Sequence, residues 1–261
     1  MRRRRRRALF ATALALAGVF AATPSASANE PVGDGSPLST FIALSTPEWN
    51  FARANSNDPC WPATAIGADG SQHAPAGRNP WPDTDSGCAP VRSPFTTYVS
   101  AKQCNADEIR VSFTLYFPKD GFSPGALGHE HDFEYVALVW HRSDGTWTRD
   151  RLLMSRHGKN IPQTWAKAES WNADLSSAGL GREHPRIFIG WAKHAMFNNQ
   201  AGLKDVLSQF TDNEYRHADY RVYAAPTLRV VDDSLAQAFD RFDWGSASSD
   251  PATVSRSLCG M

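Results

Sequence analysis

Acidic and histidine side chains gather in one short stretch of the sequence, Gly128-His129-Glu130-His131-Asp132-Phe133-Glu134. Imidazole and carboxylate groups placed so close together are a typical set of metal ligands. Carboxylates outnumber imidazoles here, and oxygen-rich sites favour hard cations such as Ca²⁺ or Mg²⁺, whereas Zn²⁺ prefers more histidine or cysteine. The stretch therefore predicts a divalent-cation site, with Ca²⁺ or Mg²⁺ as the expected ion.

Spacing limits which of these side chains can share one ion. On an extended chain His129 and His131 point to one side, whereas Asp132 and Glu134 point to the other. One ion held by His129, Asp132 and Glu134 therefore requires a bend in the chain at His131. Asp120, at the end of the preceding predicted strand, can add an oxygen ligand. The predicted metal ligands are thus Asp120, His129, Asp132 and Glu134.

Other chemistries fit the same stretch less well. A cupin site needs His-x-His followed by Glu after a longer spacer, and the metallo-β-lactamase pattern fails at Glu134. Serine hydrolase chemistry has no support, because the serines lack the Gly-x-Ser-x-Gly context of a nucleophile elbow. A metal-dependent hydrolase with Glu130 or His131 as general base stays an alternative. So does a solvated loop whose charges pair with Lys119 or with arginines.

A second histidine of interest, His194, follows a predicted buried strand in the segment Gly190-Trp191-Ala192-Lys193-His194-Ala195. It could line a pocket, although a hydrogen-bonded structural histidine is the simpler interpretation. Most of the nine tryptophans are expected in the core or at its rim. An exposed subset near the metal loop could insert at a membrane interface, where indole is favoured.

Strands must position these groups. Residues 109–117 alternate apolar and polar side chains, which predicts a half-buried strand, and residues 133–141 are apolar on both faces. An Asp-Gly turn at residues 143–146 predicts a hairpin with residues 147–153 as the returning strand. Residues 186–191 are a further buried strand candidate. The sequence therefore predicts a mainly β domain.

Helices and loops complete the expected domain. Apolar residues at helical spacing from Leu235 to Phe242 predict a helix, with acidic residues at its start and Gly245 just past its end. A second, weaker helix is predicted at residues 47–54. Residues 118–132 are expected to form a loop whose glycines let it fold its side chains around one point. The sum is a single mainly β domain with peripheral helices and long loops.

Four cysteines allow three disulfide connectivities. None lies in a Cys-x-x-Cys pair, which argues against a zinc knuckle. Cys60 and Cys88 bracket a segment rich in proline and glycine, residues 58–94, which a disulfide would hold, so we pair them. Cys104 with Cys259 follows by elimination and would tie the C-terminus to the body of the domain.

The first 28 residues are typical of a secretion signal, with six consecutive arginines, a short apolar stretch and a small-x-small cleavage site at Ala26-Ser27-Ala28. The apolar stretch is shorter than the ~20 residues that span a bilayer, so no transmembrane segment is expected in the mature chain. The export route, general or twin-arginine, stays open. Residues 29–37 are expected to be a flexible lead-in, and residues 38–261 the folded domain.

Loss of the leader would change the charge balance. The full chain has 27 basic and 27 acidic side chains, and removing six arginines leaves 21 against 27, a net charge of −6. A nucleic-acid-binding protein normally presents a basic face, so this function is not expected. The mature chain is expected to be secreted and monomeric in solution.

Two motifs in order, Tyr116-Phe117-Pro118-Lys119-Asp120 and then residues 128–134, resemble the necrosis- and ethylene-inducing peptide 1-like protein family of NPP1 type. The signature of that family reads Gly-His-Arg-His-Asp-Trp-Glu and follows a Tyr-Phe-Pro-Lys-Asp segment. Cys60-Trp61-Pro62-Ala63 with Cys88 is similar to the early disulfide of the family. Lys193-His194-Ala195, Thr211-Asp212-Asn213 and the C-terminal segment are similar to bacterial members.

The resemblance implies a β-sandwich like that of actinoporin cytolysins. It implies binding to glycosylated inositol phosphorylceramide sphingolipids of plant plasma membranes, with cytolysis and necrosis and without covalent chemistry. The family cation is assigned to positions that match the four ligands given above. The remaining residues expected at the motif or at the headgroup surface are Glu130, His131, Phe133, Trp191 and His194.

The sequence departs from the family pattern in three places. Glu130 replaces an arginine and reverses a charge beside the expected ion, and Phe133 replaces a tryptophan and removes its indole N–H. The connection from Asp120 to His129 is one residue longer than usual. These departures put cytolytic potency in doubt more than they do the fold, so a surface-binding homologue without cytolytic activity is the third alternative.

Overall fold

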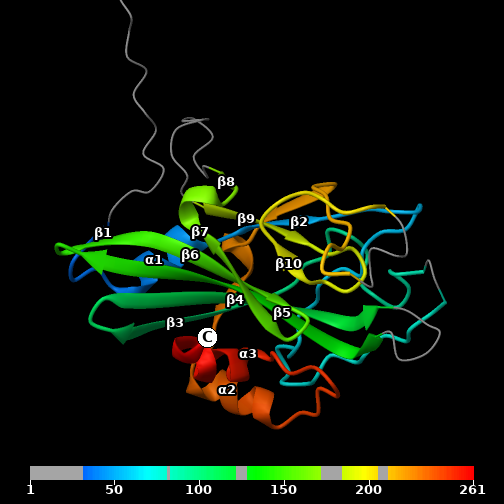
Figure 1. Cartoon of the computed structure of the whole chain (residues 1–261). Helices are drawn as coiled ribbons and strands as arrows, with labels where there is room; N and C mark the ends of the chain where they lie inside the picture. The colour runs from blue at the N-terminus through cyan, green and yellow to red at the C-terminus, as the bar shows by residue number, and fades with distance from the viewer. Residues whose placement is uncertain (1–31, 81–82, 122–127, 172–183, 205–210) are drawn as a thin grey trace, which may run out of the picture.

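The computed structural model describes residues 32–80, 83–121, 128–171, 184–204 and 211–261. Two β-sheets face each other, and short helices lie at their periphery (Figure 1). The larger sheet has seven strands. Its order is β1 (Val32–Gly33), β6 (Thr146–Arg156), β5 (Gly128–Ser143), β4 (Glu108–Gly121), β3 (Thr97–Asn105) and β12 (Leu228–Val230), with β7 (Lys159–Thr164) also paired to β6.

The smaller sheet has five strands, in the order β10 (Met196–Phe197), β9 (His184–Ile189), β2 (Glu48–Phe51) and β11 (Tyr220–Tyr223), with β8 (Ser170–Trp171) paired to β9. The helix predicted at residues 47–54 is therefore wrong. The segment forms β2, parallel to β9 and antiparallel to β11. Trp49 and Phe51, two positions apart, enter the core on one face of the strand, as the period of a strand requires.

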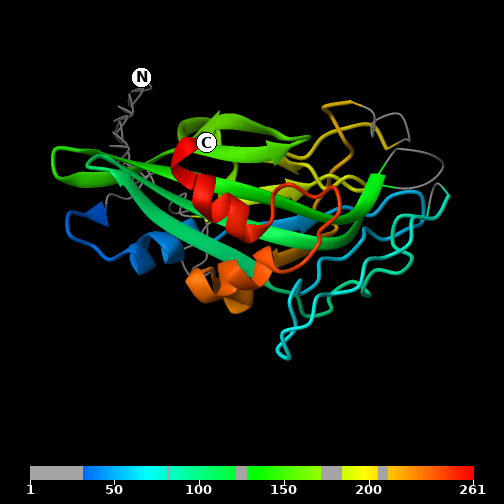
Figure 2. The ribbon, with the colours of Figure 1, turned by 90° about the horizontal axis from the view of Figure 1, so that it is seen from below.

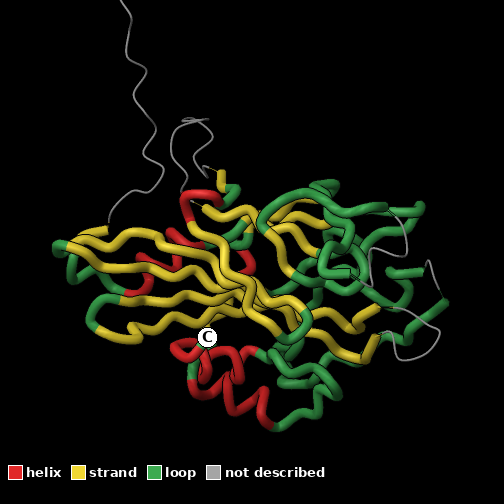
Figure 3. Tube along the Cα trace, viewed as in Figure 1, coloured by secondary structure: helices red, strands yellow, loops and turns green. Residues whose placement is uncertain are grey.

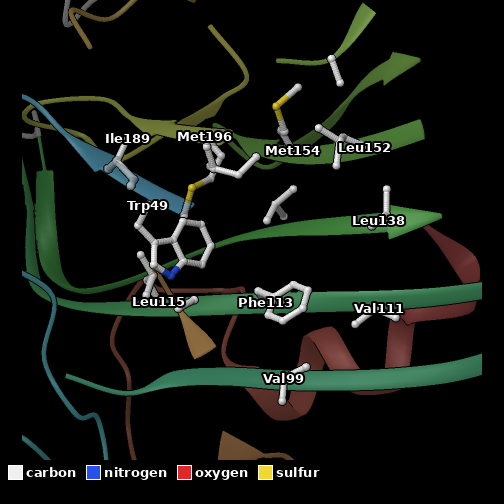
Figure 4. Close-up of a cluster of buried hydrophobic side chains, with 14 of the residues drawn as sticks. Trp49, Val99, Val111, Phe113, Leu115, Leu138, Leu152, Met154, Ile189 and Met196 are labelled. Atoms are coloured by element: carbon white, nitrogen blue, oxygen red, sulfur yellow. The ribbon is translucent and has the colours of Figure 1, made fainter. Parts of the chain in front are cut away.

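The main core fills the space between the sheets. Trp49 and Ile189 of the smaller sheet pack against β4 and β5 of the larger one, where Leu115 and Leu138 are buried (Figure 4). Burying a large apolar side chain contributes about 1.5–3 kcal/mol to the stability of the fold. This layer packs β4 and β5 against the smaller sheet.

A second layer covers the outer face of the larger sheet. There α2 (Asp233–Asp240) and α3 (Pro251–Ser257) lie across β3 and β4 (Figure 2). Tyr98 and Phe133 pack on Phe239 of α2. The alternation of residues 109–117 predicted a strand buried on one face only. The structure shows instead that both faces are buried. Even Arg110 is buried, because its guanidinium donates to main-chain carbonyls near the C-terminus.

Local signals explain both helices. Asp232 caps α2, where its carboxylate accepts a hydrogen bond from Leu235 N at 2.8 Å, so the predicted helix near 235–242 is confirmed with slightly different ends. Asp250 caps α3 in the same way, with Pro251 in the first turn. Among the described residues, the other helical segments are α1 (Leu38–Ser45), η1 (Trp165–Lys167), η4 (Ala225–Thr227) and η5 (Leu258–Gly260).

Two disulfides join Cys60 to Cys88 and Cys104 to Cys259, the pairing suggested by the sequence. The first holds the long connection between β2 and β3. The second fixes the chain after α3 to β3. Residues 1–31, with the predicted leader, lie outside the described part. None of the helices in the described chain is both long enough and apolar enough to cross a membrane.

The β4–β5 pair carries the candidate site. The described residues of the predicted loop, 118–121 and 128–132, are strand, because pairing continues to Asp120 opposite His129 and Gly121 opposite Gly128. The rest of that prediction lies outside the described residues. Loops gather at the end of the sandwich where β4 ends and β5 begins (Figure 3). The acidic stretch thus lies at the start of β5, and the paired end of β4 brings Asp120 beside it.

Candidate metal centre

Asp120, Asp132 and His194 come together at the end of the β4–β5 pair. One potential ligand atom from each of the three side chains lies within 4.8 Å of the other two. All three side chains are buried. Asp120 comes from β4, Asp132 from β5, and His194 from the connection between β9 and β10, so three separate segments build the group.

A bend at His131 determines which side chains face this group. His131 has a φ of 54°, in the left-handed region, where the chain reverses the alternation of an ordinary strand. Its ring turns to the outer face, where it shares a hydrogen bond of 2.7 Å with the Tyr116 hydroxyl and packs edge-on against Trp244. His129, Asp132 and Glu134 then line one cavity, which is the arrangement that the spacing required.

The orientation of His129 leaves one nitrogen free for a ligand. Its Nδ1–H donates to the carbonyl of His131 at 2.7 Å, so the lone pair of a neutral ring is on Nε2. That Nε2 lies 3.7 Å from Asp120 Oδ2. Metal-binding histidines commonly hold their second nitrogen in such a hydrogen bond.

His194 supports Asp132. Its Nδ1–H donates to Asp132 Oδ2 at 2.9 Å, and its ring stacks on Phe117 at 3.8 Å with an interplanar angle of 3°. The connection that carries His194 is fixed to the end of β4, since Gly121 N donates to Ala192 O at 2.9 Å. His194 is therefore placed to orient a carboxylate of the group.

Burial raises the pKa of Asp120 well above its usual range, and repulsion from Asp132 adds to the shift. Lys193 partly opposes it. Burial also raises the pKa of Glu134, again with repulsion from Asp132. The Ser155 hydroxyl donates a hydrogen bond to Glu134 and lowers this pKa in part. A group of carboxylates crowded in this way favours either protons or a bound cation.

A cavity of about 420 Å³ opens over the group. Carboxylate, imidazole, ammonium and hydroxyl groups line it. The polar lining residues apart from Asp120, His129, Asp132, Glu134 and Ser155 are Tyr135, His157, Lys159, Lys193, Ser246, Ser248 and Ser249. Such a lining suits a polar ligand with many hydroxyl groups.

Lys119 does not neutralise the acidic stretch, which was one of the alternatives from the sequence. It is fully buried and turned away, and its Nζ donates to Ser86 O at 2.7 Å within the loop closed by the first disulfide. Lys119 thus holds this loop against β4. Lys119 therefore does not compete with a cation for the carboxylates of the cavity.

The other predicted residues lie in different surroundings. Glu130 is exposed, whereas Phe133 is buried against Tyr116 and Trp244 and only borders the cavity. Trp191 is also buried, packs with alanines of another cluster and does not line the cavity. Sequence reasoning missed Ser155 and His157, which both line the cavity. His157 had a local signal, the turn His157-Gly158, whereas Ser155 had none.

The chemistry of these residues fits a divalent cation. In the described chain, Asp120 Oδ1 and His194 Nε2 are buried polar atoms without a hydrogen-bond partner. Leaving a buried charged oxygen unpaired is costly, and a cation offsets that cost. Two carboxylates, a third nearby on Glu134 and the free nitrogen of His129 form an oxygen-rich donor set of the kind that Ca²⁺ or Mg²⁺ prefers.

The fold and site define a two-sheet β-sandwich protein with a candidate cation centre at one end of its longest strand pair. The family model described as "Necrosis inducing protein (NPP1)" matches residues 50–214. The match covers more than half of the chain. The chain belongs to this family.

Solved structures share the fold. A necrosis and ethylene inducing protein 2 from the causal agent of cocoa's witches' broom disease is 20% identical, with a TM-score of 0.54 over 87% of this chain and 91% of that chain. A non-toxic HaNLP3 protein is 20% identical, with a TM-score of 0.52 over 83% and 87%. NLPPya in complex with mannosamine is 14% identical, with a TM-score of 0.52 over 88% and 94%.

The comparison with curated proteins found no match. The solved neighbours include a structure described as a toxin fold for microbial attack and plant defense, with a TM-score of 0.51 at 15% identity. The β-sandwich of actinoporin-like cytolysin type that the sequence predicted is thereby confirmed. Because the neighbours include both a necrosis-inducing and a non-toxic protein, the fold alone does not assign toxicity to this chain.

Proposed function

We propose that this chain is a secreted, divalent-cation-dependent cytolysin that binds the glycosylated sphingolipid headgroups of plant plasma membranes. The observation that carries the proposal is the buried group of Asp120, Asp132 and His194, which opens on a hydroxyl- and ammonium-lined cavity. Family membership supports the same function. The mannosamine complex of NLPPya supports a sugar as ligand, although that ligand belongs to the other protein.

The proposed ion ligands are Asp120, Asp132, Glu134 and Nε2 of His129. His194 holds Asp132 through its Nδ1–H and acts as a positioning residue. The cation supplies positive charge that attracts the hydroxyl oxygens of a sugar, and it offsets the repulsion between the carboxylates. The cavity walls add hydrogen-bond donors and acceptors, so recognition requires no covalent step.

A metal-dependent hydrolase has less support. In that alternative His131 or Glu130 would act as general base, but His131 is bonded to Tyr116 on the outer face, and Glu130 is exposed. A homologue that binds without cytolysis shares the same site chemistry. The cytolysin and the non-cytolytic homologue differ only in whether the membrane is breached after binding.

Co-sedimentation with vesicles tests the proposed binding. Phosphatidylcholine vesicles with and without plant glycosylated inositol phosphorylceramide are compared in Ca²⁺ or Mg²⁺ and in excess EDTA. We expect sedimentation only with the glycolipid and the cation together. Equal sedimentation in EDTA would remove the cation from the mechanism, and equal sedimentation with phosphatidylcholine alone would remove the sugar.

A further inference from the structure

A histidine occupies an unusual position in the hairpin between β6 and β7. Arg156 pairs with Lys159, so His157 and Gly158 form a two-residue turn, and both have positive φ, 49° and 73°. Such turns favour asparagine or aspartate before the glycine. The hairpin between β5 and β6 follows that rule with Asp144 and Gly145, at 52° and 76°. Turn geometry therefore does not explain the choice of histidine at 157.

The ring of His157 meets a buried carboxylate. Its Nε2 lies 3.3 Å from Oε1 of Glu214, whose side chain has no exposed surface, whereas the side chain of His157 is 32% exposed. Neither oxygen of Glu214 accepts a hydrogen bond within the described chain. A buried carboxylate without hydrogen-bond partners is costly. Among the described residues, its ion-pair contact is the one to His157, and the positive charges of Arg156 and Arg216 act on it from farther away.

The chain makes room for this carboxylate. A Cβ at Gly190 would lie 2.1 Å from Glu214 Oε2, and a Cβ at Gly202 would lie 2.5 Å from the Glu214 carbonyl oxygen. Arg216 fixes that carbonyl, since its Nη1 donates to it at 2.7 Å. Two glycines and an arginine thus hold Glu214 behind His157.

His157 lines the same cavity as Asp132 and Glu134. The Glu214 carboxylate, 3.3 Å from Nε2, favours the tautomer of a neutral ring that carries its proton on Nε2, and that tautomer has its lone pair on Nδ1. Within the described chain the polar contact of the ring is the one to Glu214. A molecule in the cavity can therefore donate a hydroxyl proton to Nδ1.

We infer that His157, oriented by the buried Glu214, is a second ligand-contacting element of the cavity and accepts a hydrogen bond from a sugar hydroxyl of the headgroup. This inference rests on the proposed function, since it assigns a new contact to the same ligand. His157 contacts the sugar independently of the cation. Glu214 is a positioning residue and contacts no ligand.

The variant that tests this is His157→Asn, because asparagine suits the turn and removes the ring. The matched control is Asp144→Asn in the corresponding turn on β5–β6. Three quantities are measured for each protein: the melting temperature, the cation Kd by calorimetry, and the Kd for phosphatidylcholine vesicles carrying glycosylated inositol phosphorylceramide at saturating cation.

We expect His157→Asn to weaken vesicle binding by roughly tenfold, the size of one lost hydrogen bond in a binding site. Its cation Kd and melting temperature should stay close to those of the wild type. Asp144→Asn should leave all three quantities unchanged. Vesicle binding of His157→Asn at wild-type strength overturns the inference, as does a parallel loss of cation binding, which would mean that His157 acts through the ion.

A double-mutant cycle of Glu214→Ala and His157→Asn tests the role of Glu214. Glu214→Ala should weaken vesicle binding in the wild-type background and add nothing in the His157→Asn background, although it lowers the melting temperature in both. A purely structural role would weaken vesicle binding equally in both backgrounds. If the wild type binds the cation but no glycolipid vesicle, the proposed function itself has failed, an outcome distinct from equal binding by wild type and His157→Asn.

Discussion

Nδ1 of His194 lies 2.9 Å from Oδ2 of Asp132, although 62 positions separate the two residues in the chain. The contact joins the connection between β9 and β10 to the start of β5, and thus one sheet to the other. This contact fixes the orientation of the Asp132 carboxylate, which in the proposed site is a ligand of the cation.

Replacing Asp132 by asparagine should weaken cation binding at least tenfold. The substitution keeps the shape of the side chain and the possibility of a contact with His194, but it removes a negative charge from a buried donor set. Calorimetric titration with Ca²⁺ and with Mg²⁺ measures the change. Asp240→Asn is the control, since Asp240 lies in α2 and pairs with Arg256 on the surface. Unchanged affinity in Asp132→Asn would exclude Asp132 as a ligand.

Replacing His194 by glutamine should weaken cation binding by about 10- to 100-fold, the usual effect of losing a partner that orients a metal ligand. The headgroup should bind normally once the cation is saturating. His217→Gln provides a comparison, because His217 is half exposed and contacts Asp219. Loss of headgroup binding at saturating cation would show that His194 contacts the sugar itself.

The cation should stabilise the protein more at neutral than at acid pH. In the absence of a cation, burial and mutual repulsion raise the pKa of Asp120 and of Glu134. The folded state then holds protons that the unfolded chain has released, so stability falls as pH rises above the ordinary carboxyl range near 4. A bound cation replaces these protons and removes that loss.

Melting curves between pH 5 and pH 8, in EDTA and in Ca²⁺ or Mg²⁺, measure this difference. The increase in melting temperature caused by the cation should grow with pH in the wild type. In Asp132→Asn it should be small throughout. An increase of the same size at pH 5 and pH 8 in the wild type would contradict the proton–cation competition.

Acid should also destabilise the fold at a point far from the cation site. Burial lowers the pKa of His184 from 6.5 to about 4, although a hydrogen bond to Thr46 O opposes the shift. Between about pH 6.5 and pH 4, His184 is protonated in the unfolded chain but stays neutral in the folded chain. The folded state therefore loses stability as the pH falls through this range. The loss amounts to roughly 3 kcal/mol when complete.

Urea unfolding at pH 7 and pH 4.5, compared between the wild type and His184→Asn, measures that contribution. Asparagine can still donate to Thr46 O but does not titrate in this range. The difference in unfolding free energy between the two pH values should be smaller in the variant by on the order of 1–3 kcal/mol. An equal difference in both proteins would place the acid sensitivity elsewhere.

Local patterns predicted much of the arrangement. The spacing of His129, Asp132 and Glu134 required a bend at His131, and that residue has a positive φ. Alternation predicted β4, and apolar spacing predicted α2. The helix α3 had an Asp250-Pro251 signal that was overlooked. In each case the information lies within a few neighbouring residues.

What depends on distant partners was not predictable. The segment Glu48–Phe51 forms a strand because β9 and β11, far along the chain, pair with both of its edges. Residues near 118–132 looked like a loop because of their glycines, but pairing of the strand ends extends the sheet into the site. Glu214 reaches His157 through tertiary packing alone, and no motif around it indicates the contact.

The most direct test of the central claim is dye release from vesicles that contain glycosylated inositol phosphorylceramide. We expect release in Ca²⁺ or Mg²⁺, none in EDTA, recovery when the cation is restored, and none from phosphatidylcholine vesicles. Asp132→Asn should release little dye at the same cation concentration. Equal release with and without EDTA, or no release under any of these conditions, would contradict a cation-dependent cytolysin.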